Sequence, residues 1–210
     1  MYLSESIDKT LETCRYDLYG RCYYNEVCSI LNKKFDSQFF FKSATKNYFI
    51  QDQYAVSGYY NHDDESCNIV FHFSSYYRKF SFHDDMWDSF KFTVSQVCQH
   101  EAIHKCQWQF RDGSCFTTKP FDHKTVVTEE DDKLYLSDTD EIDAYAHDIA
   151  MEIKYFYPKH NSYDILRKIS RRRKLWSYNY YRSTFSGEDW QPIKKRLLKK
   201  TYGWLPYVTI

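Results

Sequence analysis

Glycine and proline are scarce in this sequence of 210 residues, which contains only 5 Gly and 4 Pro. Aromatic residues, in contrast, make up 20% of the chain. So many large apolar rings and so few Gly and Pro residues predict a chain that folds rather than one that stays disordered. The length suffices for one domain with a real core, or for one domain with an appendage.

The sequence also lacks long hydrophobic runs. No stretch approaches the roughly 18 apolar residues of a membrane-spanning helix, and the opening MYLSESIDKTLETC has neither the basic nor the apolar region of a signal peptide. We therefore expect no membrane contact and a cytoplasmic location. The bias toward Lys, Asn, Tyr and Phe is typical of AT-rich genomes, including those of phages, so the location would be the host cytoplasm if the source is viral.

Net charge and paired cysteine motifs are missing as well. The 29 basic and 29 acidic residues cancel, which argues against a chain that binds nucleic acid over its whole surface. The seven cysteines are odd in number and contain no CxxC pair, which excludes a zinc ribbon and a disulfide scaffold.

Hydrophobic patterning predicts an α+β protein with a small antiparallel sheet. Residues 6–35 read as helix with a break at Gly20. The β-rich runs YAVSGYY (54–60) and NIVFHFS (68–74) are joined by the polar turn NHDDES, which predicts a hairpin. A further strand is expected just before it, at 48–51.

Two longer helices follow. Residues 87–110 contain no Gly or Pro and read as one helix with apolar residues on two sides, as in a central helix. Residues 111–133 read as loop. A second helix is expected within 136–158, with Ser137 or Asp138 as its N-cap and Pro158 as its stop.

The first of these helices carries the motif HEAIH. At roughly 100° per residue, His100 and His104 lie about 40° apart, so both imidazoles can converge on a Zn²⁺ ion. Glu101 falls near 100°, beside the metal, where it can take a proton from the attacking water. A chance match on a surface helix is the plain alternative, so the motif is a hypothesis that needs a third ligand.

Catalytic zinc usually has three protein ligands and one water. Positions 107 and 110 are Gln and Phe, so no third histidine follows at the usual spacing. The candidates are Glu141 and Asp143 on the second helix. They lie at opposite margins of its apolar face, and periodicity alone does not choose between them.

HEAIH together with EIDA, residues 141–144, resembles the small gluzincin-type zinc metallopeptidases of phages and of the ImmA/IrrE group. In those families one helix supplies HExxH and a second supplies Glu in an ExxA pattern. The resemblance covers about residues 55–157, and it departs at Tyr145, where Asn or Asp is usual. It implies a zincin-like fold, with zinc held by His100, His104 and Glu141.

The same resemblance implies the activity. The protein would be a zinc metallopeptidase that hydrolyses a peptide or protein substrate, with a zinc-activated water and Glu101 as general base. Residues 1–158 would form the zincin-like domain and 159–210 a basic, aromatic helical extension packed on it. An edge strand beside the active-site helix would receive the substrate, and Cys67–Ser74 is the expected strand.

The C-terminal segment supports an alternative function. RKISRRRKLWSYNYYR and KKRLLKK interleave basic residues with Trp and Tyr, a combination that grips phosphates and stacks on bases. The chain would then be a non-enzymatic nucleic-acid-binding or virion-associated protein. In either case a weak nucleic-acid contact is expected through residues 167–200, although helices packed on the core explain the pattern more simply.

Several single residues are weaker candidates. Tyr145 and His123 are candidate oxyanion donors, and Gln107 lies on the histidine side of its helix. His147 can pair with Asp143 across one turn. We expect the two thiols that flank the motif to be buried, and these are Cys98 and Cys106.

Overall fold

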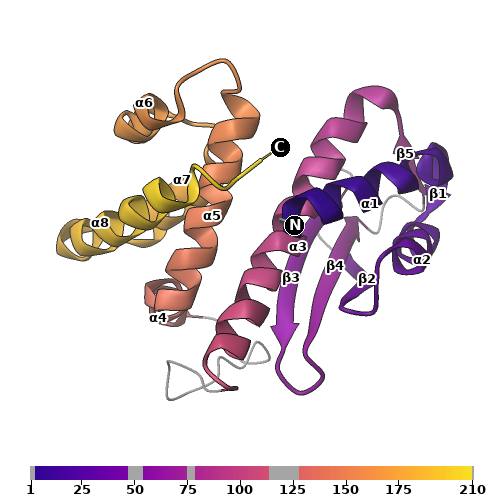
Figure 1. Cartoon of the computed structure of the whole chain (residues 1–210), viewed down its shortest axis with the longest axis horizontal. Helices are drawn as coiled ribbons and strands as arrows, with labels where there is room; N and C mark the ends of the chain where they lie inside the picture. Colours follow the sequence, from indigo (N-terminus) through magenta and orange to yellow (C-terminus); the bar gives the residue numbers. More distant parts are fainter. Residues whose placement is uncertain (1–2, 47–53, 75–78, 114–127, 210) are drawn as a thin grey trace. The chain divides into compact units, whose positions relative to one another are not determined.

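A computed structural model of the chain describes residues 3–46, 54–74, 79–113 and 128–209 (Figure 1). It confirms the α+β class, with a small sheet and mostly helices. The elements in chain order are α1 (Leu3–Leu18), β1 (Gly20–Tyr23), α2 (Tyr24–Lys34), β2 (Phe39–Lys46), β3 (Tyr54–Asn61), β4 (Ser66–Ser74), β5 (Lys79–Phe82), α3 (Asp84–Phe110), α4 (Glu129–Ser137), α5 (Thr139–Phe156), α6 (Ser162–Arg167), the 3-10 turn η1 (Ile169–Arg171), α7 (Trp176–Thr184) and α8 (Gly187–Trp204).

The chain forms two compact units, residues 1–106 and 107–210. The division falls inside α3, so the first unit holds most of that helix and the second holds its last turn. The domain division at residue 158 stays a prediction.

The main sheet of the first unit has the strand order β2-β4-β3. β3 and β4 form the predicted antiparallel hairpin, from Tyr54 opposite Phe73 to Asn61 opposite Ser66. β2 pairs with β4 in parallel, from Phe39 opposite Cys67 onward. The expectation of a purely antiparallel sheet was therefore wrong: the sheet is mixed, because β2 joins the free side of the hairpin in the direction of β4. The predicted strand at 48–51 lies outside the described residues.

One face of this sheet carries the core of the unit, and α3 covers it. Alternate residues of β4, among them Ile69 and Phe71, are fully buried. The Phe90 ring of α3 stacks on Phe71 with 6.0 Å between centroids and meets Tyr54 edge-on at 5.8 Å. In Figure 1 α3 accordingly runs alongside β3 and β4. A helix that buries one side on a sheet holds its polar side chains at fixed positions above the strands.

The predicted helix of residues 6–35 is broken at Gly20, as expected. Gly20 has a φ of +91°, which glycine adopts without the steric cost of a Cβ atom. A short strand, β1, follows and pairs antiparallel with β5, with Gly20 opposite Phe82. Side chains of α1 then reach α3: Ser95 Oγ donates to Asp8 at 2.6 Å.

The second unit is helical and is built on α5, which is buried along most of its length. The side chain of Asp138 caps this helix by accepting from the Asp140 amide at 2.7 Å. Residues 129–133 were expected in a loop but lie in α4, because Thr128 and Asp131 form a capping box that starts this helix.

The C-terminal helices pack on α5. Leu197 of α8 and Tyr178 of α7 are fully buried, and Figure 1 shows both helices beside α5. Glu152 of α5 is also buried and accepts hydrogen bonds from the Ser177 amide at 3.0 Å and the Ser177 hydroxyl at 2.7 Å. The simpler interpretation of the basic aromatic segment, helices packed on a core, is confirmed for these two helices.

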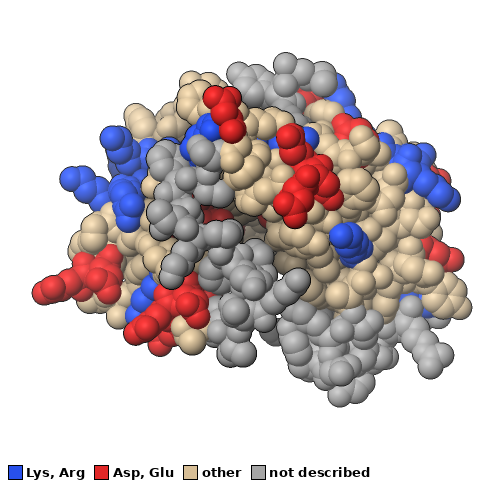
Figure 2. Space-filling model, turned by 90° about the horizontal axis from the view of Figure 1, so that it is seen from below, with Lys and Arg blue, Asp and Glu red and all other residues tan. Residues whose placement is uncertain are grey.

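The surface carries both signs of charge. On the face seen in Figure 2, acidic and basic side chains are interspersed, in keeping with the zero net charge. None of the helices in the described ranges combines the length and the apolar character needed to cross a bilayer.

Candidate metal centre

The two histidines of HEAIH lie one turn apart on α3, where the absence of Gly and Pro leaves the helix unbroken. His100 is 8% exposed and His104 is partly buried. Their ring centroids are 4.9 Å apart with the planes at 71°. The helix therefore directs both imidazoles to the same side, as the spacing predicts.

Glu101 is buried in the first unit, and it faces β3. It is 5% exposed. A Cβ atom at Gly58 would lie 2.6 Å from both Cγ and Oε1 of Glu101, which is closer than real Cβ atoms approach. Only glycine leaves room for the carboxylate at this point of the strand. Gly58 was not identified from the sequence, although a glycine inside a strand is itself a signal of close approach.

Glu141 lies in the first turn of α5, three residues after the Asp138 cap, and is 9% exposed. Tyr181 of α7 lies close by: burial raises its pKa well above the ordinary value, and the Glu141 carboxylate adds to the shift. A carboxylate near the N-terminal end of a helix is stabilised by the helix dipole, which favours its ionised form.

The last turn of α3 is joined to the first turn of α5 within the second unit. Arg111 binds Asp140 through both of its terminal nitrogens, and the Nη1–Oδ1 distance is 2.9 Å. Gln107 Nε2 donates to the Asp140 carbonyl at 3.3 Å. Gln107 follows His104 by three residues on α3, and Glu141 follows Asp140 on α5.

His100, His104 and Glu141 form a group that could hold a metal ion. Each offers one ligand atom, and these atoms lie within 4.8 Å of one another. Two donors of a tetrahedral zinc, each about 2.0–2.1 Å from the ion, are roughly 3.3 Å apart. Two imidazoles and a carboxylate are also a donor set that suits a divalent transition metal.

Asp143, the alternative third ligand, has other partners. Its Oδ1 accepts from Trp204 Nε1 at 3.2 Å and pairs with Lys200 Nζ at 3.1 Å. The proposed pairing with His147 is not what the structure shows, because the His147 ring meets Trp204 edge-on with 5.0 Å between centroids. Asp143 therefore faces α8, and Glu141 is the α5 carboxylate in the candidate metal group of the described residues.

The weaker candidates have structural roles where they are described. Tyr145 packs edge-on against Tyr181 with 5.2 Å between centroids. Cys98 is buried as predicted, but the prediction for Cys106 was wrong because this residue is exposed near the end of α3. His123 lies outside the described residues.

The prediction that Cys67–Ser74 is the edge strand that receives a substrate was also wrong. β4 is the central strand of the sheet, with β2 on one side and β3 on the other. β3 is an edge of this sheet among the described strands, and it is also the strand that carries Gly58 opposite Glu101.

Comparison with protein-family models, with curated proteins and with solved structures gives no match.

Proposed function

We propose that the chain is a zinc-dependent metallopeptidase with a zincin-like fold. The observation that carries this proposal is the clustering of His100, His104 and Glu141, with the carboxylate of Glu101 one residue from the first ligand. A pair of imidazoles and one carboxylate is a ligand set of catalytic zinc, which leaves a fourth position for water or substrate.

The three ligands would hold zinc, which supplies Lewis-acid polarisation of the scissile carbonyl and lowers the pKa of water toward about 7. Glu101 acts as the general base: its carboxylate takes the proton from the attacking water and passes it to the leaving amine. Gly58 supports this role because its missing side chain leaves space for the carboxylate beside β3.

The substrate would be an extended peptide that aligns with β3. An edge strand offers unpaired amide and carbonyl groups, so a peptide can add to it by main-chain hydrogen bonds. This places the backbone of the peptide next to the strand that contacts Glu101.

The test combines metal content with peptide cleavage. Purified protein should contain about one zinc per chain, and His104→Ala should lose it, because two remaining ligands seldom hold zinc tightly. Cleavage of a proteome-derived peptide library is read by mass spectrometry. Glu101→Gln should keep the metal yet cut at least about 100-fold more slowly, since an amide cannot accept the proton.

The matched controls are His160→Ala and Glu130→Gln, both at exposed positions outside the group. They should leave metal content and cleavage unchanged. Zinc-free wild-type protein, or a Glu101→Gln variant with normal turnover, would overturn the proposal.

The alternative function, a non-enzymatic nucleic-acid-binding or virion-associated protein, requires no metal. The same elemental analysis separates the two, because a structural core of plain helices would contain no zinc.

A further inference from the structure

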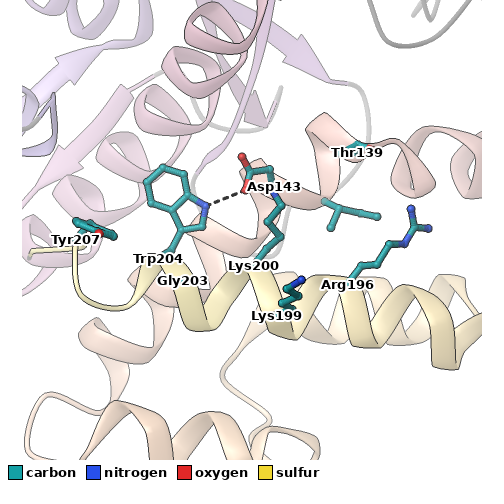
Figure 3. A pocket seen from close by; sticks show the side chains of 9 residues that line it. Thr139, Asp143, Arg196, Lys199, Lys200, Gly203, Trp204 and Tyr207 are labelled. Carbon is teal, nitrogen blue, oxygen red and sulfur yellow. Dashed lines mark hydrogen bonds and ion pairs between the residues drawn. The ribbon is translucent and has the colours of Figure 1, made fainter. Parts of the chain in front are cut away.

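A pocket of about 460 Å³ opens between α5 and α8 in the second unit (Figure 3). This size falls within the range of about 300–1,000 Å³ that is typical of small-molecule sites. One wall is a single stripe of α8 and the turn that follows it, because residues three, four and seven apart share a helix face. The stripe consists of Arg196, Lys199, Lys200, Gly203, Trp204 and Tyr207.

The charge of this pocket is positive. Asp143 compensates Lys200 through the ion pair at 3.1 Å. Arg196 and Lys199, in contrast, make no ion pair within the described part of the chain, and both are exposed. Two uncompensated cations one turn apart on a helix form a site for a phosphate group, which accepts charge-assisted hydrogen bonds from both.

The other half of the stripe is aromatic. The indole of Trp204 is half-buried and fixed in place, since its N–H donates to Asp143 at 3.2 Å. Tyr207 is 56% exposed. In Figure 3 the two rings lie at the end of the pocket that is farthest from Arg196. Aromatic rings of this kind bind flat ligands by stacking.

Gly203 also lines the pocket. A Cβ atom at this position would meet nothing within 4 Å, so the backbone borders empty space. The residue at this position therefore adds no side chain to the pocket wall.

We propose that this pocket binds a nucleobase together with its phosphate. The base stacks on Trp204 and Tyr207, and the phosphate contacts Arg196 and Lys199. The levels of Lys199 and Trp204 on α8 differ by about 7.5 Å at 1.5 Å per residue, which suits a single nucleotide lying along the helix. Either a free nucleotide or one unit of a single-stranded nucleic acid presents this chemistry.

Binding is measured by calorimetric titration of the full chain with adenosine monophosphate, adenosine, inorganic phosphate and a single-stranded oligoadenylate. A probe that holds both base and phosphate should bind saturably, and adenosine or phosphate alone should bind at least about tenfold more weakly, since each retains only half of the contacts. Binding of the monophosphate alone identifies a free nucleotide. Binding of the oligonucleotide without the monophosphate identifies a single strand as the ligand. Binding of both probes identifies both sources.

Two matched pairs of variants locate the site. Arg196→Gln with Lys199→Gln should weaken binding about tenfold or more, whereas Lys194→Gln with Lys195→Gln removes the same charge from the same helix outside the pocket and should have little effect. Gly203→Leu should block the pocket, whereas Gly203→Ala should bind nearly as the wild type does. Circular dichroism confirms that each variant is folded.

The proposal is overturned if neither base-plus-phosphate probe binds saturably, if phosphate alone binds as tightly as the nucleotide, or if the control pair loses as much affinity as the pocket pair. Because the readout is binding and none of these positions belongs to the metal group, the result is independent of the proposed peptidase activity.

Discussion

Gly58 in the edge strand β3 and Glu101 in α3 fit together so closely that the strand has room for no side chain at this position. The backbone of β3 at Gly58 thereby limits the position of the proposed general base, Glu101. Its position is consequently sensitive to a substitution that changes neither a ligand nor a charge.

Gly58→Ala should lower the rate of peptide cleavage by about 100-fold, because a catalytic group displaced by about 1 Å can lose that much. Zinc content should stay at the wild-type level, since no ligand changes. Ser57→Ala is the control: Ser57 is on the opposite face of the same strand, where its hydroxyl contacts His72 Nε2 at 2.7 Å. Wild-type cleavage by Gly58→Ala would show that Glu101 has no catalytic role in its observed position.

Glu141→Ala should weaken zinc affinity by at least about 100-fold, because it removes one of the three proposed ligands. Asp143→Ala should leave zinc affinity nearly unchanged, since Asp143 binds Lys200 and Trp204. Zinc titration against a chromogenic chelator measures both. The reverse order of effects would assign the third ligand to Asp143.

The buried thiols should resist modification. Burial raises the pKa of Cys28 to about 11 and that of Cys67 to about 12, where the charge of Glu101 adds to the effect. A thiol with a raised pKa stays protonated below that pH, so these groups remain unreactive at a pH near the ordinary thiol pKa of about 8.5.

In a Cys115→Ser background, which removes the cysteine outside the described residues, a chromogenic disulfide reagent should therefore titrate one fast thiol, Cys106. Adding Cys106→Ser should abolish the fast phase. Two or more fast thiols in the native Cys115→Ser protein would contradict the burial of the others.

Glu152→Ala should lower the free energy of unfolding by about 3 kcal/mol, because the amide and hydroxyl of Ser177 lose a buried, charged acceptor. Urea denaturation followed by circular dichroism measures the change. Glu188→Ala, at an exposed position in the first turn of α8, should change it by less than about 0.5 kcal/mol. Equal effects of the two substitutions would show that the Glu152–Ser177 contact does not stabilise the fold.

The elements that carry the proposed ligands could be predicted from sequence because their signals are local. α3 follows from a long stretch without Gly or Pro, and α5 from the Asp138 cap and the stop at Pro158. The choice of Glu141 over Asp143 came from a resemblance, and helix periodicity alone left it open. The partners of Asp143, Lys200 and Trp204, lie 57 and 61 residues further along the chain.

The features that the sequence did not predict depend on contacts between distant segments. Nothing in the pattern of β2 indicates that it pairs in parallel with β4, since both directions place the same alternate residues on the core face. The closeness of Gly58 and Glu101 likewise requires a strand and a helix to be packed first. The helix α4 was missed for another reason: its capping box was present, but its apolar residues are too few to give a helical period.

The strand pairings of the first unit determine how much of the chain must be synthesised before the unit can fold. β1 cannot pair until β5 has been made, because Gly20 lies opposite Phe82, and β2 has no partner until β4 emerges. The sheet face also stays uncovered until α3 follows. On the ribosome, these pairings and the cover of the sheet can therefore be completed only after about the first hundred residues have been made. Folding of the unit therefore cannot be completed until the segment that carries the HEAIH motif has been made.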